Sequence, residues 1–237
     1  MSVLEATGSG MTDKDGLAYL SANGWLHAVA PAFQAALLRH LRWRRFATGE
    51  TVAFAGDKEG GIFGVAYGQI GMSSGIGPAD SPIAHISLPG SWEGIMPLLG
   101  HPRYADSTAM TPTLVGLIPL AAVRSLLAGT PAWWEDILQL SVICMIRYGS
   151  GMTDLLIRDS ATRCLAVLLR LGGCRFIGNA PVTVCLTQDQ LAASANMSRN
   201  LAGEALRQAE RAGTVRIAYG HVAIVDPAAI RALVNRA

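Results

Sequence analysis

The chain has 237 residues, of which 51% are apolar, and a formal net charge of +2. This length and apolar content favour two domains with packed cores. The longest apolar stretches, Thr113 to Val123 and Ile137 to Ile146, are too short or too interrupted by Pro, Ser and Gln to span a bilayer. We therefore expect a folded, soluble protein with no membrane partner.

The N-terminal residues, Ser2 to Asp15, lack a basic region followed by an apolar stretch, so we expect no secretion signal and a cytoplasmic location. The cysteines lie too far apart for a CxxC metal or redox motif, and no paired His spacing accompanies them. We interpret them as reduced, mostly buried thiols and predict no metal site. They are Cys144, Cys164, Cys174 and Cys185.

The segment from Leu17 to Leu41 is predicted to be mainly helical. From Phe46 to about Pro119 the sequence is rich in Gly and Pro, and short β-prone segments alternate with these turn residues. Short strands at this spacing favour a small antiparallel sandwich or barrel. The predicted strands are Thr51 to Ala55, Ile62 to Tyr67, Ile83 to Ser87 and Thr113 to Ile118.

A short helix is predicted from Pro119 to Leu127 and a much longer one from Pro131 to Ile157. A helix that is apolar over most of its circumference needs cover on more than one side. We expect the β domain on one side and a second copy of the chain on the other, with a core helix in a monomer as the alternative. The two adjoining stripes are Trp133, Ile137, Leu140 and Cys144, and Leu138, Val142, Met145, Met152 and Leu156. The dimer seam is predicted at Ile137, Leu140 and Cys144.

An amphipathic helix is predicted from Ser160 to Leu171, with Asp159 as its N-cap, so a domain boundary is expected near residue 158. We expect an N-terminal sensor domain over residues 1–129, a dimerisation helix over 130–158 and a third domain over 159–237. The last contains 9 basic and 5 acidic residues, against 10 and 12 before it. Positive charge is therefore concentrated in the C-terminal third.

Thr187-Gln188-Asp189-Gln190 is a capping-box pattern that starts a short helix. Asn196 tolerates the left-handed backbone of a tight turn, and Ser198 can cap a second helix from Arg199 to Ala212. On a helical wheel one side of this second helix is apolar: Leu201, Ala202, Ala205, Leu206, Ala209 and Ala212. The opposite side is polar, which by itself fits an ordinary solvated surface helix.

The context of the second helix favours another interpretation. Val215 to Ala218 and His221 to Val225 are β-prone and joined through Tyr219-Gly220, which predicts a hairpin. Asp226-Pro227 then begins a final helix. Helix, turn, helix and hairpin in this order are typical of a winged helix-turn-helix, whose second helix lies in the DNA major groove.

The segment from Thr187 to Asp226 resembles the DNA-binding domain of the Crp/Fnr superfamily of transcription regulators. The segment FATGETVAFAGD, Phe46 to Asp57, resembles the start of the β-roll in that family, and Ile62 to Ile70 the strand and turn that follow. The resemblance implies an α+β fold with a cyclic-nucleotide-binding-like antiparallel β-roll, a long dimerisation helix and a C-terminal winged helix-turn-helix. It implies a homodimer bound to a palindromic double-stranded operator, with RNA polymerase as a further candidate partner.

Side-chain chemistry suggests how the second helix contacts DNA. Arg can bond guanine, Asn adenine and Glu cytosine at their major-groove edges. We predict base contacts by Arg199, Asn200 and Glu204, with close approach at Gly203. The family often has Glu where Asn200 stands and Arg where Glu204 stands, so a different operator is expected. The predicted phosphate contacts are Thr187, Ser198, Arg207, Arg211, Arg216 and His221.

In cyclic-nucleotide-binding relatives, a Glu binds the ribose hydroxyl and an Arg-Ser pair binds the cyclic phosphate. Here Gly94 matches the glycine before that Glu, but Ile95 replaces the Glu. Arg103 matches the phosphate arginine, but Tyr104 replaces the small hydroxyl residue. The pattern argues against cyclic-nucleotide binding and leaves open a small anionic or apolar ligand or no effector at all. A cyclic-nucleotide receptor that uses Arg103 is the alternative.

Other cofactors and an enzymatic role also have little support in the sequence. The N-terminal cysteine cluster of oxygen-sensing relatives is missing, which argues against an iron-sulfur cluster. Haem ligation through His85, His101 or Cys144 rests on residue type alone. An enzyme needs a convergent acid-base or nucleophile set, and the histidines show no recognisable spacing. They are His27, His40, His85, His101 and His221. We therefore predict a regulator rather than an enzyme.

Overall fold

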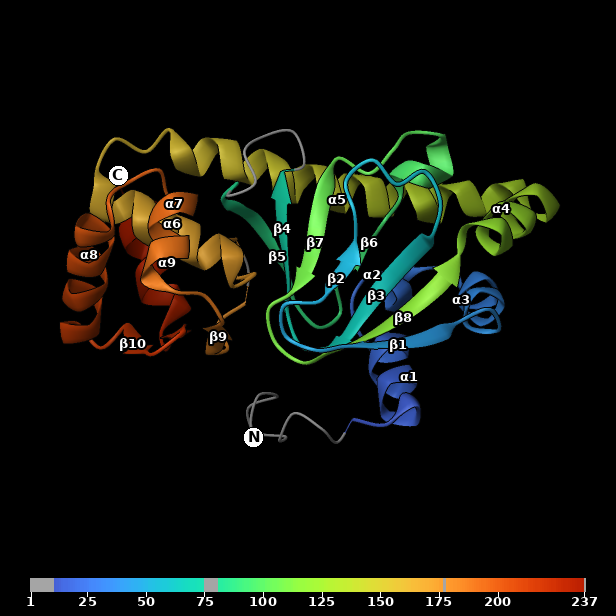
Figure 1. The fold of residues 1–237 in the computed structure, drawn as a ribbon, viewed down its shortest axis with the longest axis horizontal. Coiled ribbons are helices and arrows are strands. Elements are labelled where there is room, and N and C mark those ends of the chain that lie inside the picture. The colour runs from blue at the N-terminus through green and yellow to red at the C-terminus, as the bar shows by residue number, and fades with distance from the viewer. Residues whose placement is uncertain (1–10, 75–80, 177, 237) are drawn as a thin grey trace. The chain divides into compact units, whose positions relative to one another are not determined.

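The structure is a computed structural model that describes residues 11–74, 81–176 and 178–236. Residues 1–10, part of the N-terminal segment for which we expect no secretion signal, lie outside them. The chain forms two compact units (Figure 1). Of the described residues, the β-roll unit comprises 11–74 and 87–145, and the C-terminal unit comprises 81–86, 146–176 and 178–236. Each helix in the described part of the chain is too short or too polar to cross a membrane.

The strands of the β-roll belong to two sheets, in the orders β1-β8-β3-β6 and β2-β7-β4-β5, and residues 83–86 of β5 are part of the C-terminal unit. The strands are β1 (Arg42–Phe46), β2 (Thr51–Ala53), β3 (Gly61–Tyr67), β4 (Ile70–Ser74), β5 (Ile83–Ser87), β6 (Trp92–Glu93), β7 (Ala105–Ala109) and β8 (Thr113–Pro119). The four predicted strands are confirmed with small shifts at their ends. The predicted fold class, with its antiparallel β-roll, long helix and winged helix-turn-helix, is confirmed as well.

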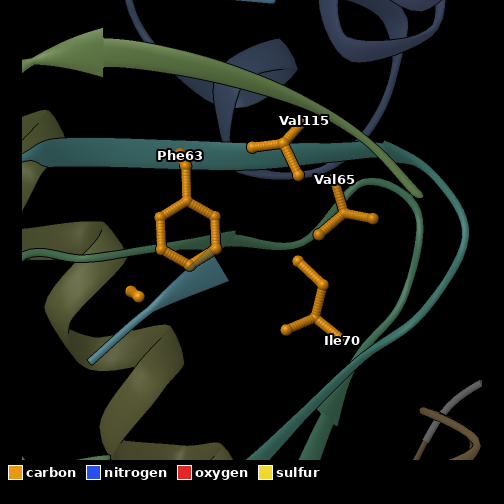
Figure 2. Close-up of a cluster of buried hydrophobic side chains, with 5 residues drawn as sticks. Phe63, Val65, Ile70 and Val115 are labelled. Carbon is orange, nitrogen blue, oxygen red and sulfur yellow. The ribbon is translucent and has the colours of Figure 1, made fainter. Parts of the chain in front are cut away.

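A buried apolar cluster joins the two sheets (Figure 2). Phe63, Val65 and Val115 come from β3 and β8 of one sheet, and Ala53 and Ile70 from β2 and β4 of the other. Side chains alternate between the faces of a strand, so each strand supplies every second residue to this core. Burial of each large apolar side chain stabilises the unit by about 1.5–3 kcal/mol.

Three short helices precede the sheets: α1 (Asp13–Ala22), α2 (Trp25–Ala28) and α3 (Pro31–Leu38). Thr12 and Asp15 form a capping box at the start of α1. Trp25 contacts Phe33 and Trp92 edge to face, and its Nε1 donates to the Asp136 carbonyl at 2.7 Å. These contacts attach α2 and α3 to the residues that begin the long helix.

The long helix α5 (Trp134–Leu155) follows α4 (Leu120–Gly129), and η1 (Met96–Leu99) and η2 (Pro131–Trp133) are short 3-10 turns. The dimer seam predicted at Ile137, Leu140 and Cys144 is wrong, because all three side chains are buried within the chain itself. Cys144 Sγ donates to Glu93 Oε2 of β6 at 3.8 Å. This stripe packs on the β-roll unit, and the adjoining stripe remains exposed.

The C-terminal unit contains α6 (Ser160–Leu171), α7 (Gln188–Ser194), α8 (Arg199–Arg211) and α9 (Pro227–Val234), with a sheet of β9 (Val182–Val184), β10 (Val215–Ala218) and β11 (His221–Ile224). Asp159 caps α6 as predicted, accepting from the Thr162 N–H at 2.7 Å. Helices α7, α8 and α9 all contact α6. Residues Cys164 to Leu171 are buried, so α6 is the core around which the unit is built.

A charged group is buried beside α6. The Asp154 carboxylate lies 3.3 Å from Arg170 Nε and 2.8 Å from Arg175 Nε. Arg170 Nη1 also donates to the Ala84 carbonyl at 2.6 Å. Nearby His85 is buried against the Tyr148 ring, and burial, followed by the charges of Arg147 and Arg170, lowers the pKa of His85 to about 3. This histidine is therefore neutral in the folded chain at neutral pH.

We expect His85 to make folding stability depend on pH. In the unfolded chain His85 is protonated below its ordinary pKa of 6.5, whereas in the folded chain it stays neutral down to about pH 3. Protonation therefore favours the unfolded chain between these pH values, and folding stability falls as the pH falls. Between neutral pH and about pH 5 the loss is about 2 kcal/mol. His85→Phe keeps a ring beside Tyr148 and should reduce this dependence, as measured by urea unfolding at several pH values. Identical pH profiles for both proteins would contradict the assignment.

Candidate functional site

The turn between α7 and α8 has the local geometry that the sequence predicts. Thr187 Oγ1 accepts from the Gln190 N–H at 3.1 Å, and Gln190 Oε1 accepts from the Thr187 N–H at 2.8 Å. Asn196 has a φ of 50°, and Ser198 caps α8 through the Leu201 N–H. These caps satisfy backbone donors at both helix starts and set where each first turn lies.

Helix α8 buries one side against α6 and α7 and exposes the other. Its buried residues are Ala202, Gly203, Ala205, Leu206 and Ala209. Arg199, Asn200 and Glu204 are exposed, as are Arg207 and Arg211. Leu201 was expected on the apolar side but is 47% exposed. At about 100° per residue it lies well away from Ala202, the middle of the buried face.

Two side chains from the first turn of α7 lie close to arginines of α8. Asp189 Oδ1 is 3.5 Å from Arg199 Nε, and both side chains are about two-thirds exposed, at 64% and 67%. A Cβ at Gly203 would lie 3.2 Å from both Arg207 Nη1 and Gln188 Oε1. Gly203 is thus buried beneath these two side chains and leaves space for them.

The hairpin of β10 and β11 extends beside α8. Ala218 pairs with His221 across the Tyr219-Gly220 turn, and the Ile217 N–H donates to Glu210 Oε1 of α8 at 2.7 Å. Arg216 and Tyr219 are exposed. The C-terminal unit therefore exposes several positively charged side chains, those of the arginines of α8 and of Arg216 in the hairpin, on a regular helix and strand.

The β-roll contains a cavity of about 260 Å³ with Arg103 in its wall. Arg103 Nη2 donates to the Gly61 carbonyl at 2.8 Å, and its guanidinium lies 5.7 Å from the centre of the Phe63 ring. Burial lowers the pKa of Arg103, and the charge of Asp57 acts in the opposite direction. The lining residues are Arg44, Phe46, Val52, Ala53, Asp57, Glu59, Gly60, Phe63, Arg103, Val115 and Leu117.

The four residues predicted for an effector pocket are only partly brought together. Gly94 has a φ of 95°, and a Cβ there would lie 2.8 Å from Arg103 Nη1, so these two are neighbours. Ile95 is buried and Tyr104 half-buried, and neither is among the described residues that line the cavity. The sequence missed Arg44 and Asp57. Both residues lie in or beside the segment FATGETVAFAGD, which resembles the start of the β-roll, and no local pattern marks them as cavity residues.

The outer face of α5 is apolar. Leu138, Val142 and Met145 are 60%, 48% and 66% exposed. Their spacing of four and three residues places them in one row along the helix. A shallow hollow is lined by Glu135, Leu138, Gln139, Val142 and Ile143.

Among the described residues, no group of three or more His, Cys, Asp and Glu side chains could hold a metal ion. Burial raises the pKa of Cys164 to about 12 and also raises that of Cys174. Both thiols are therefore protonated at neutral pH, which makes them poor metal ligands and poor nucleophiles.

Comparisons with known proteins match both units. The model of the cyclic nucleotide-binding domain matches residues 43–130, and that of the Crp-like helix-turn-helix domain matches residues 162–233. A CRP-like cAMP-activated global transcriptional regulator of Mycobacterium tuberculosis is 25% identical over 211 residues, which cover 87% of this chain and 94% of the relative.

Solved structures share the fold. A transcriptional regulator of the CRP/FNR family from Thermus thermophilus aligns with a TM-score of 0.62 at 19% identity, over 82% of this chain and 98% of its own. FixK2 from Bradyrhizobium japonicum aligns with a TM-score of 0.67 at 14% identity, over 81% of this chain and 96% of its own.

Proposed function

Because this chain belongs to the Crp/Fnr superfamily of DNA-binding transcription regulators, we propose that it binds a palindromic operator in DNA. We propose further that it does so as a homodimer and that it acts in the cytoplasm. For this function we keep the division into a sensor domain (1–129), a dimerisation helix (130–158) and a DNA-binding domain (159–237). The observation that carries the proposal is the exposed polar face of α8, held by a buried face of small residues. Small residues let the supporting helices approach closely, so the exposed face is rigidly placed.

Base contacts are assigned to the first two turns of α8. The exposed Arg199, Asn200 and Glu204 carry the donors and acceptors that match guanine, adenine and cytosine. Gly203 contributes space rather than a contact, since it is buried below Arg207 and Gln188. Phosphate contacts set the register and come from residues around this face. They are Thr187, Ser198, Arg207, Arg211, Arg216 and His221.

We expect the purified chain to enrich a two-fold symmetric sequence from a random pool of duplex DNA at fixed ionic strength. Arg199→Ala should remove about 1–3 kcal/mol of discrimination at one base pair, because a bidentate contact is lost. Arg207→Ala, the matched control, should weaken binding to operator and random duplex by the same factor. Fluorescence anisotropy with both duplexes measures this. Equal losses for Arg199→Ala would contradict its base contact, and no enrichment would contradict the proposed function.

The dimer is assigned to the outer face of α5. Leu138, Val142 and Met145 form an exposed row, and the same spacing of four and three continues through Gly149 to Met152. This is the heptad spacing of a two-stranded coiled coil. A dimer paired along this row would carry two copies of α8, one for each half-site of a palindromic operator, whose half-sites lie one DNA turn apart, about 34 Å.

Val142→Glu should separate the dimer, because a carboxylate would be buried in an apolar seam at a cost of several kcal/mol, roughly 3 or more. Phe54→Glu is the control, since Phe54 is 58% exposed and lies outside α5. Sedimentation equilibrium should show a monomer for the first variant and a dimer for the second. A dimer in both would contradict the assigned seam.

A cyclic-nucleotide effector is the second candidate, and the position of Arg103 in the cavity wall favours it. The mycobacterial relative is named for activation by cAMP. Against it, Ile95 offers no acceptor for a ribose hydroxyl, and the cavity contains Asp57 and Glu59 besides the arginines. We therefore propose that an effector, if one binds here, is not held as a cyclic nucleotide is in those relatives.

Calorimetric titration of the chain with cyclic AMP and cyclic GMP should show no saturable binding up to about 1 mM, a binding free energy weaker than about 4 kcal/mol. The reason is that, of the Glu, Arg and Ser that bind the cyclic nucleotide in those relatives, this chain has only the arginine, Arg103. Micromolar binding that Arg103→Ala abolishes would contradict this expectation and establish the second candidate.

A further inference from the structure

The ion pair between Asp189 and Arg199 connects the first turn of α7 to the first residue of α8. The capping box of Thr187 and Gln190 holds the backbone of that first turn in place. Asp189 is the second residue of α7, and its Oδ1 lies 3.5 Å from Arg199 Nε. The two helices that form the turn thus meet at the arginine assigned to a base contact.

The atom of Arg199 that Asp189 approaches is chemically important. A guanidinium carries one N–H at Nε and two at each terminal nitrogen. Bidentate recognition of guanine O6 and N7 needs two donors arranged as a fork. A carboxylate at Nε leaves the two terminal nitrogens available as that fork. Asp189 can therefore hold the side chain of Arg199 without occupying the edge that would contact a base.

The ion pair between Asp189 and Arg199 contributes little to folding stability, and it does not increase the affinity for DNA in general. Both side chains are about two-thirds exposed, and exposed ion pairs change an equilibrium by at most about fivefold. A carboxylate on this face also repels phosphates and so weakens binding to every duplex. Ordering a long, flexible side chain before binding does reduce the entropy that binding loses. That gain applies only where Arg199 makes its specific contact.

A different side chain of α7 lies near the neighbouring arginine, Arg207. Arg207 Nη1 and Gln188 Oε1 both lie 3.2 Å from the position of a Cβ on Gly203. Gln188 is neutral, so unlike Asp189 it brings no negative charge near the arginine assigned to a phosphate contact. The first turn of α7 therefore places an acidic side chain beside Arg199 and an uncharged one beside Arg207.

We propose that Asp189 is a specificity-determining positioning residue: it orients Arg199 through Nε for one base pair, at the expense of affinity for DNA in general. The inference rests on the proposed function, in which the exposed face of α8 contacts the operator. Asp189 itself contacts no base in this arrangement.

Two variants of Asp189 distinguish the effect of its contact with Arg199 from the effect of its negative charge on DNA affinity. Asp189→Asn removes the charge and keeps an acceptor oxygen at the same position, whereas Asp189→Ala removes both. The base pair that depends on Arg199 is first identified by comparing the sequences selected by wild-type chain and by Arg199→Ala. Affinities are then measured for the selected operator, for the operator altered at that base pair and for a random duplex. Urea unfolding of each variant checks that the fold is unchanged.

Both variants should bind the random duplex more tightly and by similar factors, since both lose the repulsive carboxylate. Discrimination at the Arg199-dependent base pair should fall by about two- to fivefold per half-site in Asp189→Ala and by less in Asp189→Asn. In the Arg199→Ala background, Asp189→Ala should leave discrimination unchanged.

Equal changes in affinity for the selected and the altered operator in Asp189→Ala would overturn the proposal, because they would make Asp189 only a source of charge. If Arg199→Ala keeps the wild-type sequence preference, the inference is overturned while the DNA-binding function stands. If wild-type chain enriches no sequence, the proposed function fails and the inference fails with it.

Discussion

Helix α5 is apolar on two adjoining faces, and the chain itself buries only one of them. Ile137, Leu140 and Cys144 are covered by the β-roll unit, whereas Leu138, Val142 and Met145 face outward. Exposed apolar rows of this kind are unusual on a monomer, and each such side chain would gain about 1.5–3 kcal/mol on burial. The unpaired face favours a second copy of the chain, and the proposed homodimer depends on it.

The C-terminal unit depends on α6, whose residues are almost all buried. Helices α7 and α8 contact it, and α8 buries the face that contains Ala202, Ala205 and Leu206, which leaves its polar face outside. Beside α6, one carboxylate, Asp154, is shared between Arg170 and Arg175. Taking such charges out of water is costly, and they are tolerated because each has a charged partner and Arg170 also bonds the Ala84 carbonyl. The group specifies one arrangement of these segments.

Much of the fold could be predicted from local patterns. The strands β3, β5 and β8 are short β-prone segments between turn residues, and Asp159 and Ser198 are helix caps by residue type and position. Strand β1, Arg42–Phe46, was missed because three of its five residues are arginines, and it is held by pairing with β8. Strand β6 has two residues, too few for any periodicity, and forms only because β3 lies beside it.

The features of the candidate sites also fall into those set by local sequence and those set by tertiary packing. The sequence by itself determined the helix-turn-helix, because caps, the left-handed Asn196 and the polar face of α8 are set by residues within a few positions of one another. Only the tertiary structure decided which stripe of α5 is buried, that Arg44 and Asp57 share a cavity with Arg103, and that Asp189 lies beside Arg199. Periodicity shows that a face exists. Which partner covers that face depends on contacts between residues distant in the chain, and these form only once the elements pack.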